Sequence, residues 1–219
     1  PSPIYQLKIT LIRSKPPIWR RVLVSSSITL EKLHRIIQAV MEWDDSHSHG
    51  FRSPKRQPLA EVDVNMTIEE FILARLREMQ DDPFENEDQT QINQYLIAVK
   101  DRLLYKYDYG DGWDHVIELE KILPPDPELK LPVCTAGRQA APVDDVGGMW
   151  GYYHYLEMRA APKAVRDKDE RYSLVKDFFP KGFAPNVFDL EAANARLYWL
   201  QPGKNGGKLS RIIRRWGTL

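Results

Sequence analysis

The stretch from Tyr105 to Glu120 constrains the fold of this chain more than any other. It reads YKYDYGDGWDHVIELE, with tyrosines at three alternate positions, then a Gly-Asp-Gly, then apolar residues that alternate with polar ones. Alternation with a period of two is typical of strands that bury one face. The pattern therefore predicts two antiparallel strands, at 102–109 and 113–123, joined by Gly110–Gly112.

The length of the turn decides which residues face each other in this hairpin. A two-residue turn would pair the tyrosines with the polar-face residues Asp114, Val116 and Glu118, because a one-residue slip moves every side chain of a strand to the other face of the sheet. A three-residue turn keeps the apolar and aromatic side chains on one face, so we expect that turn. The predicted pairs are Tyr109 with Trp113, Tyr107 with His115, Tyr105 with Ile117 and Leu103 with Leu119.

The same register places Asp108 opposite Asp114, with Asp111 at the tip of the turn. Like charges that face each other destabilise a strand pair, so we expect an Arg or Lys, a cation or water to compensate them. Carboxylates are ligands for hard cations, although this spacing matches no established calcium loop. These three aspartates and His115 are the part of the hairpin that strand alternation does not explain.

The remaining sequence predicts one α+β domain that ends near Leu200. Its mostly antiparallel sheet includes an opening hairpin, because two alternating segments flank the break Ser14–Pro17. The further predicted strands lie at 4–12 and 18–24, and the segment 44–53 is a loop that enters a third strand. The predicted helices lie at 29–43, 67–76, 149–159, 169–177 and 189–199, and a long irregular loop lies at 123–148. Ser27 or Thr29 is expected to cap the first helix.

Composition narrows the class of protein. With 42% hydrophobic residues, the 219-residue chain can bury a core, and it has no apolar run of the roughly 18 residues that a membrane helix needs. We therefore expect no membrane partner. The N-terminal residues PSPIYQLKIT lack a signal-peptide pattern, and a single cysteine, Cys134, cannot form an internal disulfide. The expected location is cytoplasmic.

The charge is zero overall but unevenly distributed. Residues 78–88 carry six acids and no base, whereas residues 201–219 carry five bases and no acid. If the tail is helical, an apolar stripe opposes a basic side formed by Lys208, Arg211, Arg214 and Arg215, with Trp216 beside it. Such a tail could dock on its own domain, or bind an anionic partner, either a nucleic acid or another protein. A membrane surface is a less suitable partner for so short a segment.

His47 and His49 form a second candidate pair. If the segment around them is extended, both imidazoles project to one side, together with Phe51. Two histidines on one strand face suit a transition metal when a carboxylate or a third histidine joins them. The candidate partners are Asp44, Asp45 and His115. The alternative is a structural role in which the histidines bond to loop backbone, and His34 is expected to be ordinary packing beside the first helix's apolar stripe.

Nucleophilic catalysis has little support in the sequence. Cys134 is expected to be a small buried residue, and neither a G-x-S-x-G elbow nor a P-loop occurs. The segment Asp145–Gly148 precedes a predicted helix and could bind an anion with its amides. We favour a tight turn and a helix start at that point.

Several linked motifs of this chain resemble one known family. The motifs are IWRRVLV, ITLEKLHRIIQAVMEWDDSHSHGF, YKYDYGDGWDHVIELE, PVCTAGRQAAPVDDVGGMWGY and FDLEAANARL, in that order from about residue 4 to residue 197. They resemble the family named after the third open reading frame of a root-inducing plasmid (plasmid ORF-three-like). The resemblance implies a compact α+β fold and no established activity. Ser48 stands where the family usually has leucine, Val143 where proline is common and Asp144 where glutamate is common.

Two functional hypotheses follow. The first is a binding or interaction domain with a polar groove, associated with plasmid or mobile-element DNA through its basic tail. The groove would be lined by the Cys134–Gly148 loop and by Asp44, Asp108, Asp111, Asp114, His115 and Asp145. The second is a metal-dependent hydrolase with a divalent metal as its cofactor. It would use His47, His49 and His115 with one of the hairpin aspartates, and it requires those side chains to converge.

Overall fold

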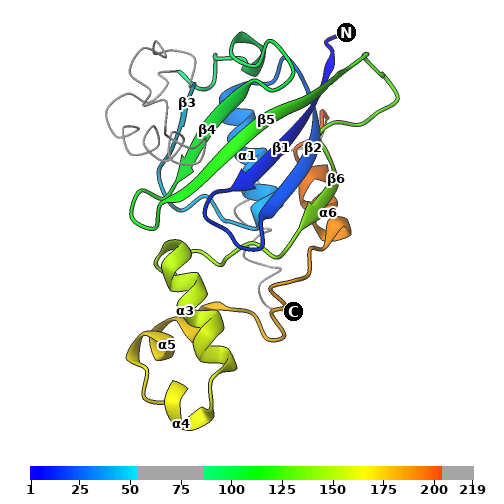
Figure 1. The fold of residues 1–219 in the computed structure, drawn as a ribbon. Coiled ribbons are helices and arrows are strands. Elements are labelled where there is room, and N and C mark those ends of the chain that lie inside the picture. Colours follow the sequence, from blue (N-terminus) through cyan, green and yellow to red (C-terminus); the bar gives the residue numbers. More distant parts are fainter. Residues whose placement is uncertain (54–85, 204–219) are drawn as a thin grey trace.

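The computed structural model describes residues 1–53 and 86–203. Within these ranges the chain forms one six-stranded antiparallel sheet with helices packed on it (Figure 1). The strands are β1 (Ile4–Leu11), β2 (Ile18–Ser25), β3 (His49–Arg52), β4 (Arg102–Tyr107), β5 (Trp113–Leu123) and β6 (Val133–Arg138). The helices are α1 (Leu30–Met41), α3 (Gly148–Ala160), α4 (Lys163–Arg166), α5 (Glu170–Val175) and α6 (Leu190–Tyr198), with short 3-10 turns η4 (Ile92–Gln94) and η5 (Lys176–Phe178). The predicted α+β class is confirmed.

The strand order in the sheet is β3-β4-β5-β1-β2-β6, and all neighbouring strands are antiparallel. The predicted opening hairpin is β1–β2, and it occupies the middle of the sheet beside β5. The stretch 123–148, which the sequence predicts to be mostly irregular, contributes the edge strand β6. This strand escaped the prediction because its residues, VCTAGR, show no alternation of polar and apolar positions.

Helix α1 provides the main cover of the sheet. Thr29 caps it, since its side chain accepts a hydrogen bond from the backbone N–H of Lys32, and Glu42 ends it in the left-handed conformation. The apolar stripe predicted for this helix is buried against the strands, and each large side chain in it contributes about 1.5–3 kcal/mol by leaving water. In Figure 1, α1 lies behind the sheet, and α6 lies beside β6.

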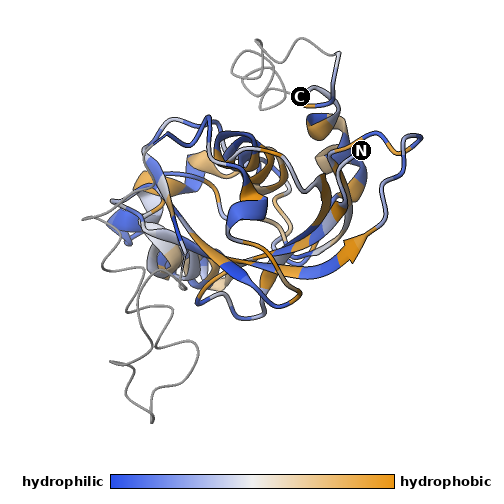
Figure 2. Cartoon of the chain, turned by 90° about the horizontal axis from the view of Figure 1, so that it is seen from above, coloured by the Kyte–Doolittle hydropathy of each residue, from blue (hydrophilic) through white to orange (hydrophobic). Residues whose placement is uncertain are grey.

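The two faces of the sheet differ in chemistry, because successive side chains point to opposite sides. Figure 2 shows hydrophobic and hydrophilic residues alternating along the strands. The face toward α1 carries an aromatic layer that includes Tyr105, Tyr107 and Trp113, all fully buried. The opposite face carries ion pairs, such as Arg21 with Glu120 at 2.6 Å and Arg102 with Glu118 at 2.6 Å.

The hairpin forms as predicted, but its register is different. The observed pairs are Tyr107 with Trp113, Tyr105 with His115, and Leu103 with Ile117. The predicted three-residue turn is therefore wrong, and a longer loop spans residues 108–112. A shift of two residues keeps every side chain on its face, so the alternation could not exclude it. Local bonds favour the longer loop: the Asp108 carboxylate accepts the N–H of Gly110 at 2.8 Å, and Asp108 itself has a φ of 52°.

The helices after β6 form two groups. Helices α3, α4 and α5 lie below the sheet in Figure 1, and stacked rings of Tyr155 and Phe179, 3.5 Å apart, pack inside this group. Helix α6 packs on β6 and α1, where the Asn194 amide bonds to the backbone of Cys134. Three of these helices match the predicted ones, and the short α4 has no counterpart in the prediction.

Some predicted features lie outside the described residues. These are the helix at 67–76, most of the acidic segment 78–88, and the basic tail from residue 204 onward. Within the described ranges, no helix combines the length and the apolar character required to cross a bilayer.

Candidate metal centre

The segment from Asp44 to His49 carries side chains to two polar clusters. It connects α1 to β3, and the chain bends at His47 before the strand begins at His49. The bend breaks the two-residue repeat, so His47 and His49 do not act on one centre as predicted. Instead, each histidine belongs to a different group of side chains whose ligand atoms lie within 4.8 Å of one another.

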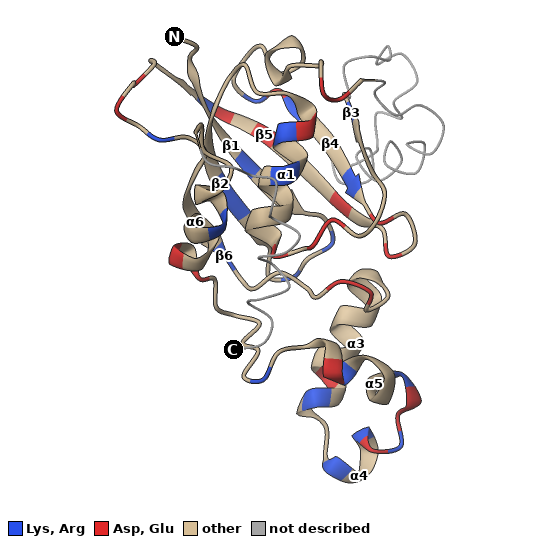
Figure 3. Ribbon diagram, turned by 180° about the vertical axis from the view of Figure 1, so that it is seen from behind, with Lys and Arg blue, Asp and Glu red and all other residues tan. Residues whose placement is uncertain are grey.

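The first group, the aspartate cluster, consists of His47, Asp108 and Asp144, with Asp145 beside it. Nε2 of His47 lies 3.1 Å from Oδ1 of Asp145 and 3.9 Å from Oδ2 of Asp108. This nitrogen is shielded from solvent and makes no hydrogen bond within the described part of the chain. Figure 3 shows the acidic residues of the β4–β5 loop and of the segment before α3 near each other at the lower end of β4.

Two aromatic residues hold the side chain of Asp144, the third member of this cluster. The hydroxyl of Tyr107 donates to Oδ2 of Asp144 at 2.8 Å, and the indole N–H of Trp113 approaches Oδ1 at 3.3 Å. Burial raises the pKa of Asp144 to about 6, and the charge of Asp145 adds to this rise, while the bond from Tyr107 and the charge of His47 oppose it. A carboxylate held in such surroundings is costly to ionise unless a cation joins it.

The second group, the stacked-histidine cluster, consists of His34, Asp45 and His49, with Glu87 beside it. The imidazoles of His34 and His49 are parallel to within 4°, with centroids 3.4 Å apart. Nε2 of His34 is 2.7 Å from Oδ1 of Asp45, and Nε2 of His49 is 3.0 Å from Oε2 of Glu87. His34 is buried beside the apolar stripe of α1, as expected, and it also hydrogen-bonds to Tyr105 and Asp45.

Asp111, predicted for the polar site, anchors α3 instead. Its Oδ2 accepts the backbone N–H of Gly147 at 2.9 Å, at the residue before the helix. A Cβ on Gly148 would lie 2.2 Å from the backbone oxygen of Asp111, and Gly148 has a φ of +66°. The glycine pair thus allows the hairpin loop to approach the helix start, and the amide of Gly147 binds an internal carboxylate.

Asp114 points to the opposite face of the sheet. It pairs across the strands with Lys106, and the predicted pairing with Asp108 is wrong. Arg13 lies 2.7 Å from its Oδ2 and Lys106 lies 3.5 Å from its Oδ1, so the expected compensation comes from basic side chains. Burial raises the pKa of Asp114, and the two cations oppose this rise.

His115 is part of the core. It is fully buried, it lies edge-on to Trp43 with ring centroids 5.4 Å apart, and its Nδ1 bonds to the carbonyl of Trp113 at 2.9 Å. Its pKa is lowered to about 3, mainly by burial and to a smaller extent by the charge of Arg20, while bonds to the backbone of Trp113 and Tyr105 oppose the decrease. His115 belongs to neither cluster, so the predicted set of His47, His49 and His115 does not meet at one point.

The structure thus separates the predicted residues. It places Asp108, Asp145 and His47 together, and leaves Asp111, Asp114 and His115 elsewhere, while Asp44 is exposed and belongs to neither cluster. Asp45, named as a candidate partner of the two histidines, does lie beside His49, whereas three cluster residues were missing from the prediction: His34, Glu87 and Asp144. A histidine beside the apolar stripe of α1 and the Asp144–Asp145 pair were the available signals for two of them.

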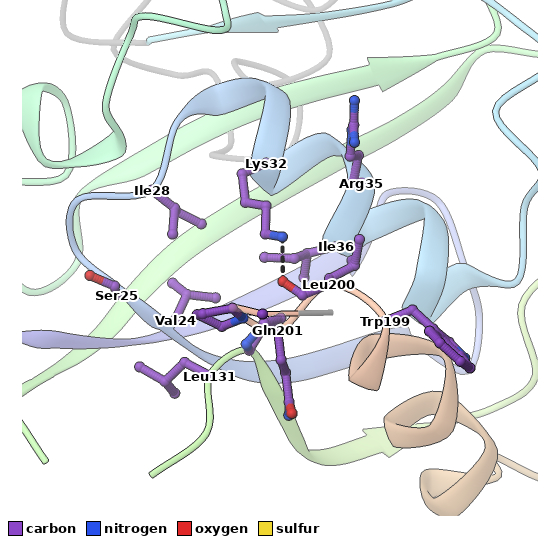
Figure 4. A pocket seen from close by; sticks show the side chains of 13 residues that line it. Val24, Ser25, Ile28, Lys32, Arg35, Ile36, Leu131, Trp199, Leu200 and Gln201 are labelled. Carbon is purple, nitrogen blue, oxygen red and sulfur yellow. Dashed lines mark hydrogen bonds between the residues drawn. The ribbon is translucent and has the colours of Figure 1, made fainter. Parts of the chain in front are cut away.

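Other candidate features contribute less. Cys134 is buried, and burial raises the pKa of its thiol, which does not favour a nucleophile. A cavity of about 470 Å³ lies between α1 and the chain after α6, where Lys32 bonds to the carbonyl of Leu200 (Figure 4). None of the candidate site residues lines this cavity. The predicted nucleic-acid or protein contact through Lys208, Arg211, Arg214, Arg215 and Trp216 lies outside the described residues.

Comparisons with known proteins agree with the motif resemblance. The model of the family described as "Plasmid pRiA4b ORF-3-like protein" matches residues 3–192, a range that contains both clusters. The chain is 33% identical over 167 residues to the uncharacterized protein y4hQ of Sinorhizobium fredii (strain NBRC 101917 / NGR234), over 74% of this chain and 76% of that protein. It is similar to the crystal structure of MM3350, a protein of unknown function from Methanosarcina mazei Go1, with a TM-score of 0.66 and 33% identity over 86% of this chain and 96% of that one. This chain therefore belongs to the plasmid pRiA4b ORF-3-like family.

Proposed function

We propose that this chain is a binding domain whose ligand site is a divalent metal ion held by the aspartate cluster. The observation that carries the proposal is the convergence of His47, Asp108 and Asp144, whose ligand atoms lie within 4.8 Å of one another. These residues come from three separate segments, and each is the type of side chain that binds Mn²⁺ or a similar cation.

The charge of the cluster supports a cation. Asp108 is nearly buried, and Asp144 and Asp145 bring two further carboxylates to the same place. Within the described ranges, the ion pairs of Asp108 and Asp145 are both made with His47. A single imidazole cannot balance three carboxylates, whereas a divalent ion would remove most of their repulsion.

The cluster would also leave room for a ligand. One imidazole nitrogen and two or three carboxylate oxygens do not fill the six positions of an octahedral ion. The remaining positions would hold water or an oxygen atom of a bound molecule. This arrangement fits a domain that captures oxygen-rich ligands through its metal.

Titration of the full chain with Mn²⁺, after chelator treatment, tests the proposal. We expect the wild type to bind Mn²⁺ and Asp108→Asn or His47→Gln to bind it at least about tenfold more weakly, because each removes a ligand. Asp111→Asn is the matched control, since Asp111 lies in the same loop but is bound to Gly147. No binding by the wild type, or equal affinities for Asp108→Asn and Asp111→Asn, would overturn it.

A metal-dependent hydrolase is the second candidate. The observation that favours it is the exposed Asp145 beside His47, because a carboxylate near a metal-bound water can act as a general base. The metal-loaded protein should then hydrolyse bis(p-nitrophenyl) phosphate or p-nitrophenyl acetate, and His47→Gln should abolish this activity. A protein that binds Mn²⁺ but hydrolyses neither substrate would favour the binding domain.

A further inference from the structure

We infer that the stacked-histidine cluster is a second, nitrogen-rich metal site that takes a transition-metal ion such as Zn²⁺ or Co²⁺. It shares no residue with the aspartate cluster, so the inference goes beyond the proposed function and stands without it. His34 comes from α1, Asp45 from the segment after it, and His49 from the first residue of β3.

The donor atoms lie close enough together to reach one ion. Two atoms bound to the same tetrahedral zinc at about 2.0–2.1 Å lie about 3.4 Å apart. The ligand atoms of His34, Asp45 and His49 lie within 4.8 Å of one another, and Oε2 of Glu87 lies 3.0 Å from Nε2 of His49. The two imidazoles are stacked with centroids 3.4 Å apart, so a ring must rotate about its side-chain bonds before both nitrogens face a common centre.

The surrounding contacts orient these side chains as in a metal site. Nδ1 of His34 bonds to the hydroxyl of Tyr105 at 2.8 Å, which leaves Nε2 facing Asp45. Gln38 supports both partners: its amide donates to the Tyr105 hydroxyl at 3.1 Å, and its carbonyl accepts the N–H of Asp45 at 3.1 Å. A histidine ligand commonly has its second ring nitrogen held in this way, which fixes the ring for the metal.

Charge balance favours a metal over protons. Asp45 and Glu87 bring two negative charges, which two imidazolium ions or one divalent metal could neutralise. Two imidazolium rings stacked at 3.4 Å would repel each other, and His34, at 3% exposure, is poorly placed to be charged. One divalent ion bound to two neutral imidazoles neutralises the site without this repulsion.

The site is closed on one side and open on the other. His34 and Tyr105 form its buried wall, whereas the side chain of Asp45 is 53% exposed and that of His49 is 24% exposed. A metal ion can therefore reach the donors from solvent. The two nitrogen donors distinguish this site from the aspartate cluster, because imidazole selects Zn²⁺ or Co²⁺ over the harder Mg²⁺ and Mn²⁺.

Visible absorption of Co²⁺ provides the test. The full chain is freed of metal by a chelator and titrated with Co²⁺. A Co²⁺ ion with four protein ligands absorbs visible light more strongly than the six-coordinate ion in water. We expect the wild type to give a saturable band and His49→Gln to bind Co²⁺ at least about tenfold more weakly. His34→Asn should have the same effect, and Gln38→Met, which removes the support, should weaken binding less.

Matched variants separate this site from others. His154, on α3, forms another partly buried His–Asp pair, with its Nε2 3.0 Å from Oδ1 of Asp169. The variant His154→Gln should therefore bind Co²⁺ like the wild type. His47→Gln should bind Mn²⁺ more weakly but retain the Co²⁺ band, so failure of either site is seen independently of the other. Because His34 is buried and its variant could unfold, His49→Gln, checked by circular dichroism, decides the question. No Co²⁺ band in the wild type, or an unchanged band in folded His49→Gln, would overturn the inference.

Discussion

Asp108 and Asp114 belong to the same hairpin and are almost equally buried, at 8% and 5% exposure, yet their surroundings are opposite. Asp114 lies on the ion-paired face of the sheet, between Arg13 and Lys106. Asp108 lies at the end of β4, where its neighbours are His47 and other aspartates. One carboxylate is balanced by the fold, and the other is not balanced by the described residues.

This difference indicates different roles. A carboxylate between two basic side chains contributes to folding, and its removal leaves those charges without a partner. A carboxylate grouped with others opposes folding until a cation arrives. Stability measurements on matched variants can therefore distinguish a structural aspartate from a ligand, even before any ligand is known.

The largest effect is expected from Asp114→Ala. Loss of this carboxylate leaves Lys106, which is mostly buried, without its partner, and we expect the free energy of unfolding to fall by about 3 kcal/mol. Urea denaturation measures this change. The double variant Arg13→Gln/Asp114→Ala should lose less than the sum of its two single variants, because they share one interaction. A loss below about 1 kcal/mol for Asp114→Ala would contradict the structural role.

His115 extends the comparison to a buried group that stays uncharged. Burial lowers its pKa from 6.5 to about 3, so the unfolded chain binds more protons than the folded one between these pH values. The stability from the neutral ring is present above pH 6.5 and is lost as the pH falls, by about 2 kcal/mol at pH 5. His115→Phe should lack this part of the acid destabilisation. Urea denaturation at pH 7.5 and pH 5 measures it, and an equal pH effect in both proteins would contradict the prediction.

The smallest effect is expected from Asp108→Asn without metal. Asparagine retains an oxygen for the N–H of Gly110, tolerates the φ of 52° and removes one negative charge from the cluster. We expect its free energy of unfolding in chelator to stay within about 0.5 kcal/mol of the wild type. Addition of Mn²⁺ should then stabilise the wild type more than the variant. A large loss in chelator would show that Asp108, like Asp114, has a structural role.

Much of the scaffold followed from local patterns. The alternation at Tyr105, Tyr107, Trp113 and Ile117 correctly indicated which side chains share a face, since this depends only on the backbone's period of two. The apolar spacing in α1 and the cap at Thr29 predicted the helix for similar reasons. The linked motifs also identified the family, which the match over residues 3–192 confirmed.

Only the tertiary structure decided the register and the membership of the clusters. A shift of two residues leaves the faces unchanged, so alternation could not choose between Tyr107 opposite His115 and Tyr107 opposite Trp113. In the observed register Asp114 lies opposite Lys106 and not opposite Asp108. The meeting of His47 with Asp144 joins segments far apart in the chain, and that of His34 with His49 depends on how α1 lies against β3. Spacing along a sequence cannot specify such contacts, because they depend on how α1, β3 and the hairpin pack in space.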